Sequence, residues 1–139
     1  GWSPDVVHCH GWMTALVPAY IKTTYKDDPT FKNSKVVYSV YERDFTEKLN
    51  ENFAKKAVMG GMTEEDTKVY SQTDSIGVDN GAIFYSDAVV IASENIENDV
   101  LNYVKNSKKP TLAYNLTEDF ENYFNFYEEL TQNEFITVA

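Results

Sequence analysis

The sequence predicts an α/β fold, in which a parallel sheet lies between two layers of helices. Short runs of β-branched residues alternate with segments of helical periodicity. The clearest run, AVVIA at 88–92, is apolar throughout, as is typical of a strand buried on both faces. We expect one three-layer domain over residues 1–139, with strands at 6–9, 36–40, 88–92 and 111–114.

The first unit is a strand, a sharp turn at Gly11 and a helix. From Met13 onward the apolar residues recur at the spacing of one helix face. Pro18 removes a backbone donor there, so we expect a kink or a helix start close to it. Ligands in α/β folds bind at the carboxyl ends of strands. The residues at that end of the first strand are His8, His10, Gly11 and Trp12.

Two helices are expected after the second strand. Asp44 is a suitable N-cap for a helix that runs to about Ala57, with Leu49 and Phe53 on its inner face. The sequence TEED at 63–66 has the form of a capping box and predicts a new helix at Thr63. Residues 63–86 then read as two helical pieces, interrupted near 73–75.

The last third of the chain predicts two more helices. Ser93 is expected to cap one of them, with Val100 and Val104 on its inner face. Aromatic residues at 120–127 follow a spacing of three and four. That spacing favours a helix face packed on the domain, and the alternative is an exposed platform for carbohydrate. Residues 134–138 predict either an edge strand or a disordered tail.

The composition excludes two classes of partner. The formal net charge is −10, and Arg43 is the only arginine among twelve basic residues. Binding to nucleic acid or to an anionic membrane needs a basic face, so we expect neither. No run of about 18 apolar residues is present, so we expect no transmembrane helix. Cys9 is the only cysteine, which favours a reducing compartment, and we expect a cytoplasmic protein.

Three segments resemble the family of bacterial glycogen synthases and plant starch synthases. PDVVHCHGW at 4–12 is similar to the family's PDVVHxHDW. KVVYSVYE at 35–42 stands where the family has a strand ending in T(V/I)HN, and NGAIFYSDAVVIAS at 80–93 resembles lKxGixyaDxvxTVSp. Together they cover most of residues 1–105. The resemblance implies a Rossmann-like sheet from the amino-terminal domain of a GT-B glycosyltransferase. It is closest to a short form of the family with that domain alone.

The resemblance also implies an activity, namely transfer of glucose from ADP-glucose to an α-1,4-glucan without a cofactor. It places the sugar pocket at His10, Gly11, Trp12, Tyr41 and Glu42. The family has an acid at the position of Gly11, and histidine and asparagine at those of Tyr41 and Glu42. We therefore assign no catalytic residue, and expect weak ADP-glucose binding and undetectable transfer.

The alternative function is a catalytically degenerate, single-domain relative. Such a protein would bind glucan, a nucleotide sugar or a partner protein. A more distant alternative is another GT-B enzyme, an epimerase or a flavodoxin-like binding module.

Two short motifs have competing interpretations. His8 and His10 alternate along a strand and could share one face of a metal site, but the sequence holds no further histidine and only Cys9. The alternative is that both imidazoles pack and hydrogen-bond, and we assign no metal. NLT at 115–117 fits a glycosylation sequon, yet its position favours a turn and a helix cap.

The start of the chain leads directly into a buried strand. We interpret the sequence as a fragment that lacks earlier strands, because a central strand needs neighbours on both sides. One face or edge of the sheet is then expected to be poorly covered. An unpaired edge promotes association, so we expect homo-oligomers that form through it.

Overall fold

The computed structural model describes residues 1–43, 49–71, 75–117 and 120–132. These residues form a four-stranded sheet in which every strand runs parallel to its neighbour, in the order β1-β2-β3-β4. The strands are β1 (Val6–His10), β2 (Lys35–Val40), β3 (Ala88–Ile91) and β4 (Thr111–Leu112). The predicted α/β class with a parallel sheet is confirmed.

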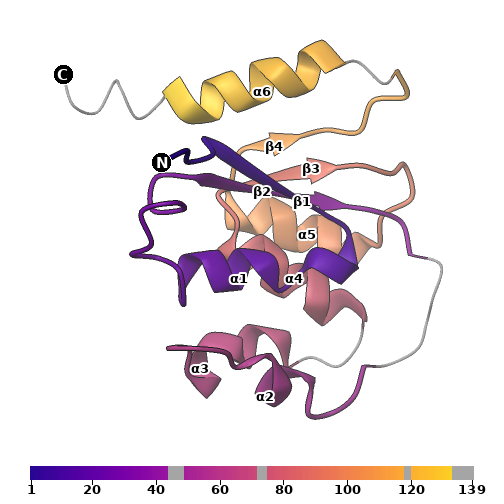
Figure 1. Cartoon of the computed structure of the whole chain (residues 1–139). Coiled ribbons are helices and arrows are strands. Elements are labelled where there is room, and N and C mark those ends of the chain that lie inside the picture. Colours follow the sequence, from indigo (N-terminus) through magenta and orange to yellow (C-terminus); the bar gives the residue numbers. More distant parts are fainter. Residues whose placement is uncertain (44–48, 72–74, 118–119, 133–139) are drawn as a thin grey trace.

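Helices lie on both faces of the sheet (Figure 1). α1, α4 and α5 cover one face, α6 lies against the other, and α2 and α3 form an outer group beyond α1 and α4. No helix in the described ranges is long and apolar enough to cross a membrane. The helices are α1 (Val17–Lys22), α2 (Phe53–Ala57), α3 (Glu64–Thr67), α4 (Ser75–Tyr85), α5 (Asn98–Ser107) and α6 (Phe120–Gln132).

Side chains of β2 alternate between the two halves of the core. Val36, Tyr38 and Val40 pack with residues of α4 and α5. Val37 points the other way and packs with residues of α6. All of these side chains are buried, so β2 is covered on both faces, as its β-branched composition predicts.

A buried ion pair joins the end of β2 to α4. The Arg43 guanidinium pairs with the Asp79 carboxylate, and both side chains are only 3% exposed. The Tyr38 hydroxyl donates to the same carboxylate over 2.5 Å. Burial and the Asp79 charge raise the pKa of Tyr38, which keeps the phenol protonated. The only arginine of the chain is therefore committed to the core.

The strands differ from their predicted bounds at four ends. β2 begins at Lys35 instead of residue 36. β1 continues through His10, beyond the predicted 6–9, because His10 still pairs with Ser39. β3 ends at Ile91 instead of residue 92. β4 ends at Leu112 instead of residue 114, because its pairing with β3 stops at Val90. Among the described residues, no strand pairs with the outer edge of β1.

The helix expected from Met13 begins later. Residues Trp12–Thr14 form one turn of 3-10 helix, and α1 starts at Val17 with Pro18 in its first turn. This position of Pro18 agrees with the prediction, since proline needs no donor there. Met13 was expected on the inner face and is largely exposed, because the 3-10 turn changes the direction of its side chain.

The helix expected from Asp44 to Ala57 is shorter than predicted. Asp44 lies outside the described residues. Residues 49–52 are not helical, and α2 covers only Phe53–Ala57. The Asn50 side chain accepts a hydrogen bond from the Asn52 N–H over 2.9 Å. Asparagine often competes with a helix through such a local turn.

The two predicted caps have different outcomes. Thr63 caps α3 through a complete capping box with Asp66, as predicted. A 3-10 turn at Lys68–Tyr70 follows α3, and α4 then begins at Ser75, which the predicted interruption near 73–75 included; residues 73 and 74 lie outside the described ranges. Ser93 caps no helix, because the chain bends at residues 93–94 without entering a helix. α5 begins at Asn98, after Glu97.

Lys109 caps α4 from outside that helix. Its ammonium group lies 2.6 Å from the carbonyl oxygens of Ile83 and Phe84, and 2.5 Å from that of Ser86. These carbonyls lie at the carboxyl end of the helix, where a positive charge is favourable. The contact ties the start of β4 to the end of α4.

Replacing Lys109 by methionine should destabilise the fold. We expect Lys109→Met to lower the free energy of unfolding by about 1–3 kcal/mol, because partly buried carbonyls lose a charged donor. Urea denaturation measures the change. The exposed Lys32 provides a matched control, and Lys32→Met should change stability by less than about 0.5 kcal/mol. Equal effects would contradict the capping role.

Candidate functional site

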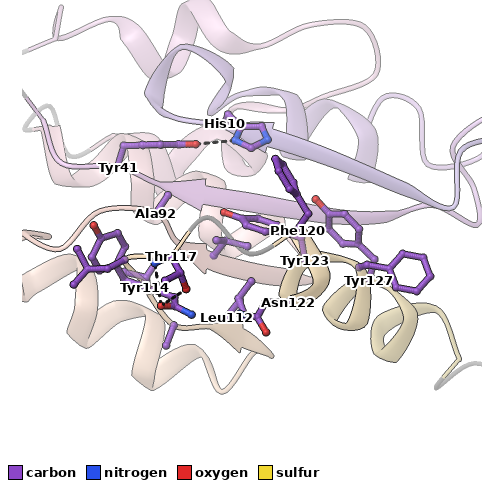
Figure 2. A pocket seen from close by; sticks show the side chains of 16 residues that line it. His10, Tyr41, Ala92, Leu112, Tyr114, Thr117, Phe120, Asn122, Tyr123 and Tyr127 are labelled. Atoms are coloured by element: carbon purple, nitrogen blue, oxygen red, sulfur yellow. Dashed lines mark hydrogen bonds between the residues drawn. The ribbon is translucent and has the colours of Figure 1, made fainter.

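A cavity of about 820 Å³ opens where the carboxyl ends of the strands meet α6 (Figure 2). Its lining comes from the end of β1, the residue after β2, the end of β3, the segment after β4 and α6. Ligands of parallel α/β folds bind at this edge of the sheet. The lining residues are His10, Tyr41, Val90, Ile91, Ala92, Leu112, Ala113, Tyr114, Asn115, Leu116, Thr117, Phe120, Asn122, Tyr123, Phe124 and Tyr127.

His8 anchors α6 to the sheet next to this cavity. One ring nitrogen, Nε2, lies 2.7 Å from the Ser39 hydroxyl, and Nδ1 contacts the Tyr127 hydroxyl of α6. Burial, and then the charge of His10, lowers the pKa of His8 to about 4. The imidazole is therefore neutral near pH 7. One of its nitrogens donates and the other accepts a hydrogen bond.

His10 and Tyr41 form a pair at the mouth of the cavity. The imidazoles of His8 and His10 stack with ring centroids 4.0 Å apart. His10 Nδ1 lies 3.0 Å from the Tyr41 hydroxyl, and Figure 2 shows Tyr41 reaching toward this ring. Burial, followed by the nearby Tyr123, raises the pKa of Tyr41. The Tyr41 phenol is therefore protonated near pH 7, and together with the His10 ring it offers hydrogen-bonding groups to a ligand.

Gly11 makes the sharp turn after β1. Its φ of 71° and ψ of 174° lie in a region that only glycine adopts without strain. Its N–H donates to the Ser39 carbonyl over 3.0 Å, which holds the turn against β2. An added Cβ would lie 3.7 Å from the Tyr41 ring, which is an ordinary van der Waals contact. Glycine is therefore required here by the backbone conformation and not by a lack of space.

The five predicted pocket residues do not all meet. His10 and Tyr41 line the cavity and contact each other. Gly11 lies beside Tyr41. Trp12 and Glu42 are exposed and are not among the described lining residues. A role of the five in sugar binding stays a prediction.

A metal site at the two histidines finds no geometric support. They share one face, as expected for alternate strand residues, but both ring nitrogens of His8 are engaged. Cys9 packs into the opposite half of the core, and burial raises the pKa of its thiol to about 11. Over the described ranges, no three His, Cys, Asp or Glu side chains are grouped to hold a metal ion.

Comparison with known proteins places the chain in a family. The model of the starch synthase catalytic domain matches residues 1–113. The chain belongs to the starch synthase catalytic domain family. The resemblance seen in the segments at 4–12, 35–42 and 80–93 is thereby confirmed.

Relatives of the starch synthase family are similar over part of their length. A glycogen synthase of Clostridium perfringens is 31% identical over 117 residues, which is 83% of this chain and 22% of that protein. One of Pseudothermotoga lettingae is 31% identical over 91 residues, or 64% of this chain and 18% of that protein. The chain thus spans about a fifth of the relatives' length. No solved structure matches.

The starch synthase match ends before α6 begins. Residues 114–132 lie beyond it, and they include Tyr114, Asn115, Phe120 and Asn122 of the cavity lining. The resemblance stated from the sequence did not reach these residues. The aromatic spacing at 120–127 and the sequon at 115–117 were the available signals.

The structure gives different outcomes for the sequon at 115–117 and for the aromatic spacing at 120–127. The Asn115 side-chain oxygen accepts from the Thr117 N–H over 3.2 Å and from its hydroxyl over 3.1 Å, so the motif forms the predicted turn. Whether it caps a helix depends on residues 118–119, outside the described ranges. Phe126 packs on the sheet as predicted, whereas Phe120 and Phe124 are exposed.

Stability should decrease in mild acid because of His8. Its folded pKa of about 4 lies below its ordinary value of 6.5, so the unfolded chain binds the proton first. The contribution of neutral His8 is complete above about pH 6.5 and is lost as the pH falls toward 4. Urea denaturation at pH 7 and pH 4.5 should show a loss of about 1–3 kcal/mol from this group. The variant His8→Gln should lack this pH-dependent loss of stability. If its pH dependence equals that of the unmodified chain, the assignment to His8 is contradicted.

Restoring an acid at residue 11 should strain the turn. We expect Gly11→Asp to lower the free energy of unfolding by about 1–3 kcal/mol, since aspartate does not tolerate this φ and ψ. Thermal unfolding measures the effect. Gly61, which has open space around its Cβ position, is the control, and Gly61→Asp should stay within about 0.5 kcal/mol. Similar losses in both variants would refute the backbone argument.

Proposed function

We propose that this chain serves glycogen or starch synthesis as the glucan-holding domain of a glycogen synthase-type glycosyltransferase. In that reaction glucose passes from ADP-glucose to an α-1,4-glucan. The observation that carries the proposal is the paired His10 and Tyr41 at the strand ends of a starch synthase-family sheet. They open onto a cavity whose described lining holds no Asp, Glu, Lys or Arg side chain.

A cavity lining without Asp, Glu, Lys or Arg side chains suits a glucan better than a nucleotide diphosphate. Imidazole, phenol and amide groups can hydrogen-bond sugar hydroxyls, each worth about 0.5–1.5 kcal/mol. A departing diphosphate needs cations where its charge develops. The single guanidinium of the chain is buried against Asp79. Cations for the donor must therefore come from outside the described lining.

A catalytically degenerate relative that binds glucan without transferring glucose is the second candidate. The observation that favours it is the backbone at Gly11, which disfavours the acid that the family resemblance places there. Both candidate functions include binding of glucan. They differ only in whether glucose is then transferred to it.

Transfer of radiolabelled glucose from ADP-glucose to glycogen separates the two candidates. We expect no incorporation and only weak ADP-glucose binding for this chain by itself. With the full-length protein, incorporation that falls at least tenfold in Tyr41→Ala would support the transferase. Tyr25 is as exposed as Tyr41, at 40%, so Tyr25→Ala is the matched control and should retain activity.

Binding of glycogen, measured in the same preparations, gives the other outcomes. Glycogen binding without incorporation by the full-length protein would support the degenerate relative. If the folded, unmodified full-length protein neither binds glycogen nor incorporates glucose, both candidate functions are overturned.

A further inference from the structure

The apolar stripe of α6 extends beyond the sheet that it covers. Phe120, Tyr123, Tyr127 and Leu130 follow one another at spacings of three, four and three residues, and such residues share a helix face. Leu130 is buried over the sheet, whereas Phe120 is 83% exposed. The neighbouring Phe124 is 60% exposed. Tyr123 between them packs on the sheet beside His8, so the exposed apolar surface at this end of α6 is that of Phe120 and Phe124.

These two phenylalanines stand over the cavity and both belong to its lining. The strand ends supply an apolar floor that includes Val90 and Leu112. Asn115 and Asn122 add amide groups to the rim. In Figure 2 the side chains of α6 and those of the segment after β4 converge on the same space.

This combination selects the chemical class of the ligand. A pyranose ring has an apolar face of C–H groups, which packs on an aromatic ring, and an equatorial belt of hydroxyls, which needs neutral donors and acceptors. A lipid would offer no partner to the Asn122 amide or to the amino group of Asn115, whose oxygen already accepts from Thr117. A phosphorylated ligand would lack cations in the described lining and would meet a chain of net charge −10.

The volume of the cavity fits a short segment of a polymer. At about 820 Å³ it lies within the range of roughly 300–1,000 Å³ that ligand pockets occupy. Two of its lining residues, Phe120 and Phe124, are largely exposed to solvent, so a longer chain could contact them beyond the cavity itself.

We propose that α6 and the strand ends form a glucan subsite, in which Phe120 and Phe124 stack on glucose units of an α-1,4-linked chain. Asn115 and Asn122 bond the hydroxyls of those units. The inference rests on the proposed function and specifies where on the domain the glucan binds. The strand ends of the subsite lie within residues 1–113, which match the starch synthase family, whereas its proposed stacking and amide residues lie beyond that match.

Calorimetric titration of the whole chain with maltoheptaose tests the subsite. Each of Phe120→Ala and Phe124→Ala should weaken binding about two- to tenfold, and the double variant more. Phe84 is 54% exposed on α4, which lies on the other face of the sheet. Phe84→Ala is therefore the matched control and should bind as the unmodified chain does. Because the rings are exposed, melting temperatures should not change.

The remaining outcomes separate this inference from the proposed function. Unchanged binding in the double variant overturns the subsite and leaves a glucan-binding domain. No maltoheptaose binding, together with glucose incorporation by the full-length protein, overturns the subsite and leaves the transferase. Absence of both overturns both proposals. Equal affinity for the β-1,4-linked cellohexaose would overturn the assignment to an α-glucan.

Discussion

The handedness of the strand connections constrains the whole molecule. The strands lie in the sheet in the same order as in the chain, so every connection advances in one direction. Parallel connections are right-handed almost without exception, and all connecting helices must then fall on one face. The opposite face, with Val37 and Val90, is left for α6 to cover.

The docking of α6 couples the fold to the candidate site. Phe126 and Leu130 bury its carboxyl-terminal half against the sheet, and Tyr127 contacts His8. The first turn of α6 lies near the carboxyl ends of the strands (Figure 1). The interaction that completes the core thus also makes one wall of the cavity. Neutral His8 connects the two roles, because it joins Ser39 of β2 to α6.

Family membership and local chemistry support different parts of the functional argument. The starch synthase match identifies the family of the domain, and the general rule for parallel α/β folds points to the carboxyl ends of the strands as the ligand edge. It does not decide turnover, because fold alone does not imply function. The local chemistry supports the proposal of a sugar polymer as ligand, since Arg43 is held in the core by Asp79 and the described cavity lining has no Asp, Glu, Lys or Arg side chain.

The sequence by itself determined the features that depend on neighbouring residues. Buried strands such as 88–92, the capping box at Thr63 and the helix start near Pro18 follow from local composition and backbone geometry. The family, too, was legible in short segments. Of the predicted pocket, His10 and Tyr41 reach the cavity.

Only the tertiary structure decided which side chains meet at the site. Trp12 and Glu42 do not line the cavity, because the 3-10 turn and the end of β2 direct them elsewhere. Phe120 and Phe126 belong to the same aromatic run, yet one is exposed and the other buried. Periodicity assigns a residue to a helix face. Where the sheet beneath that face ends depends on strand lengths and connection handedness, which are properties of the assembled fold.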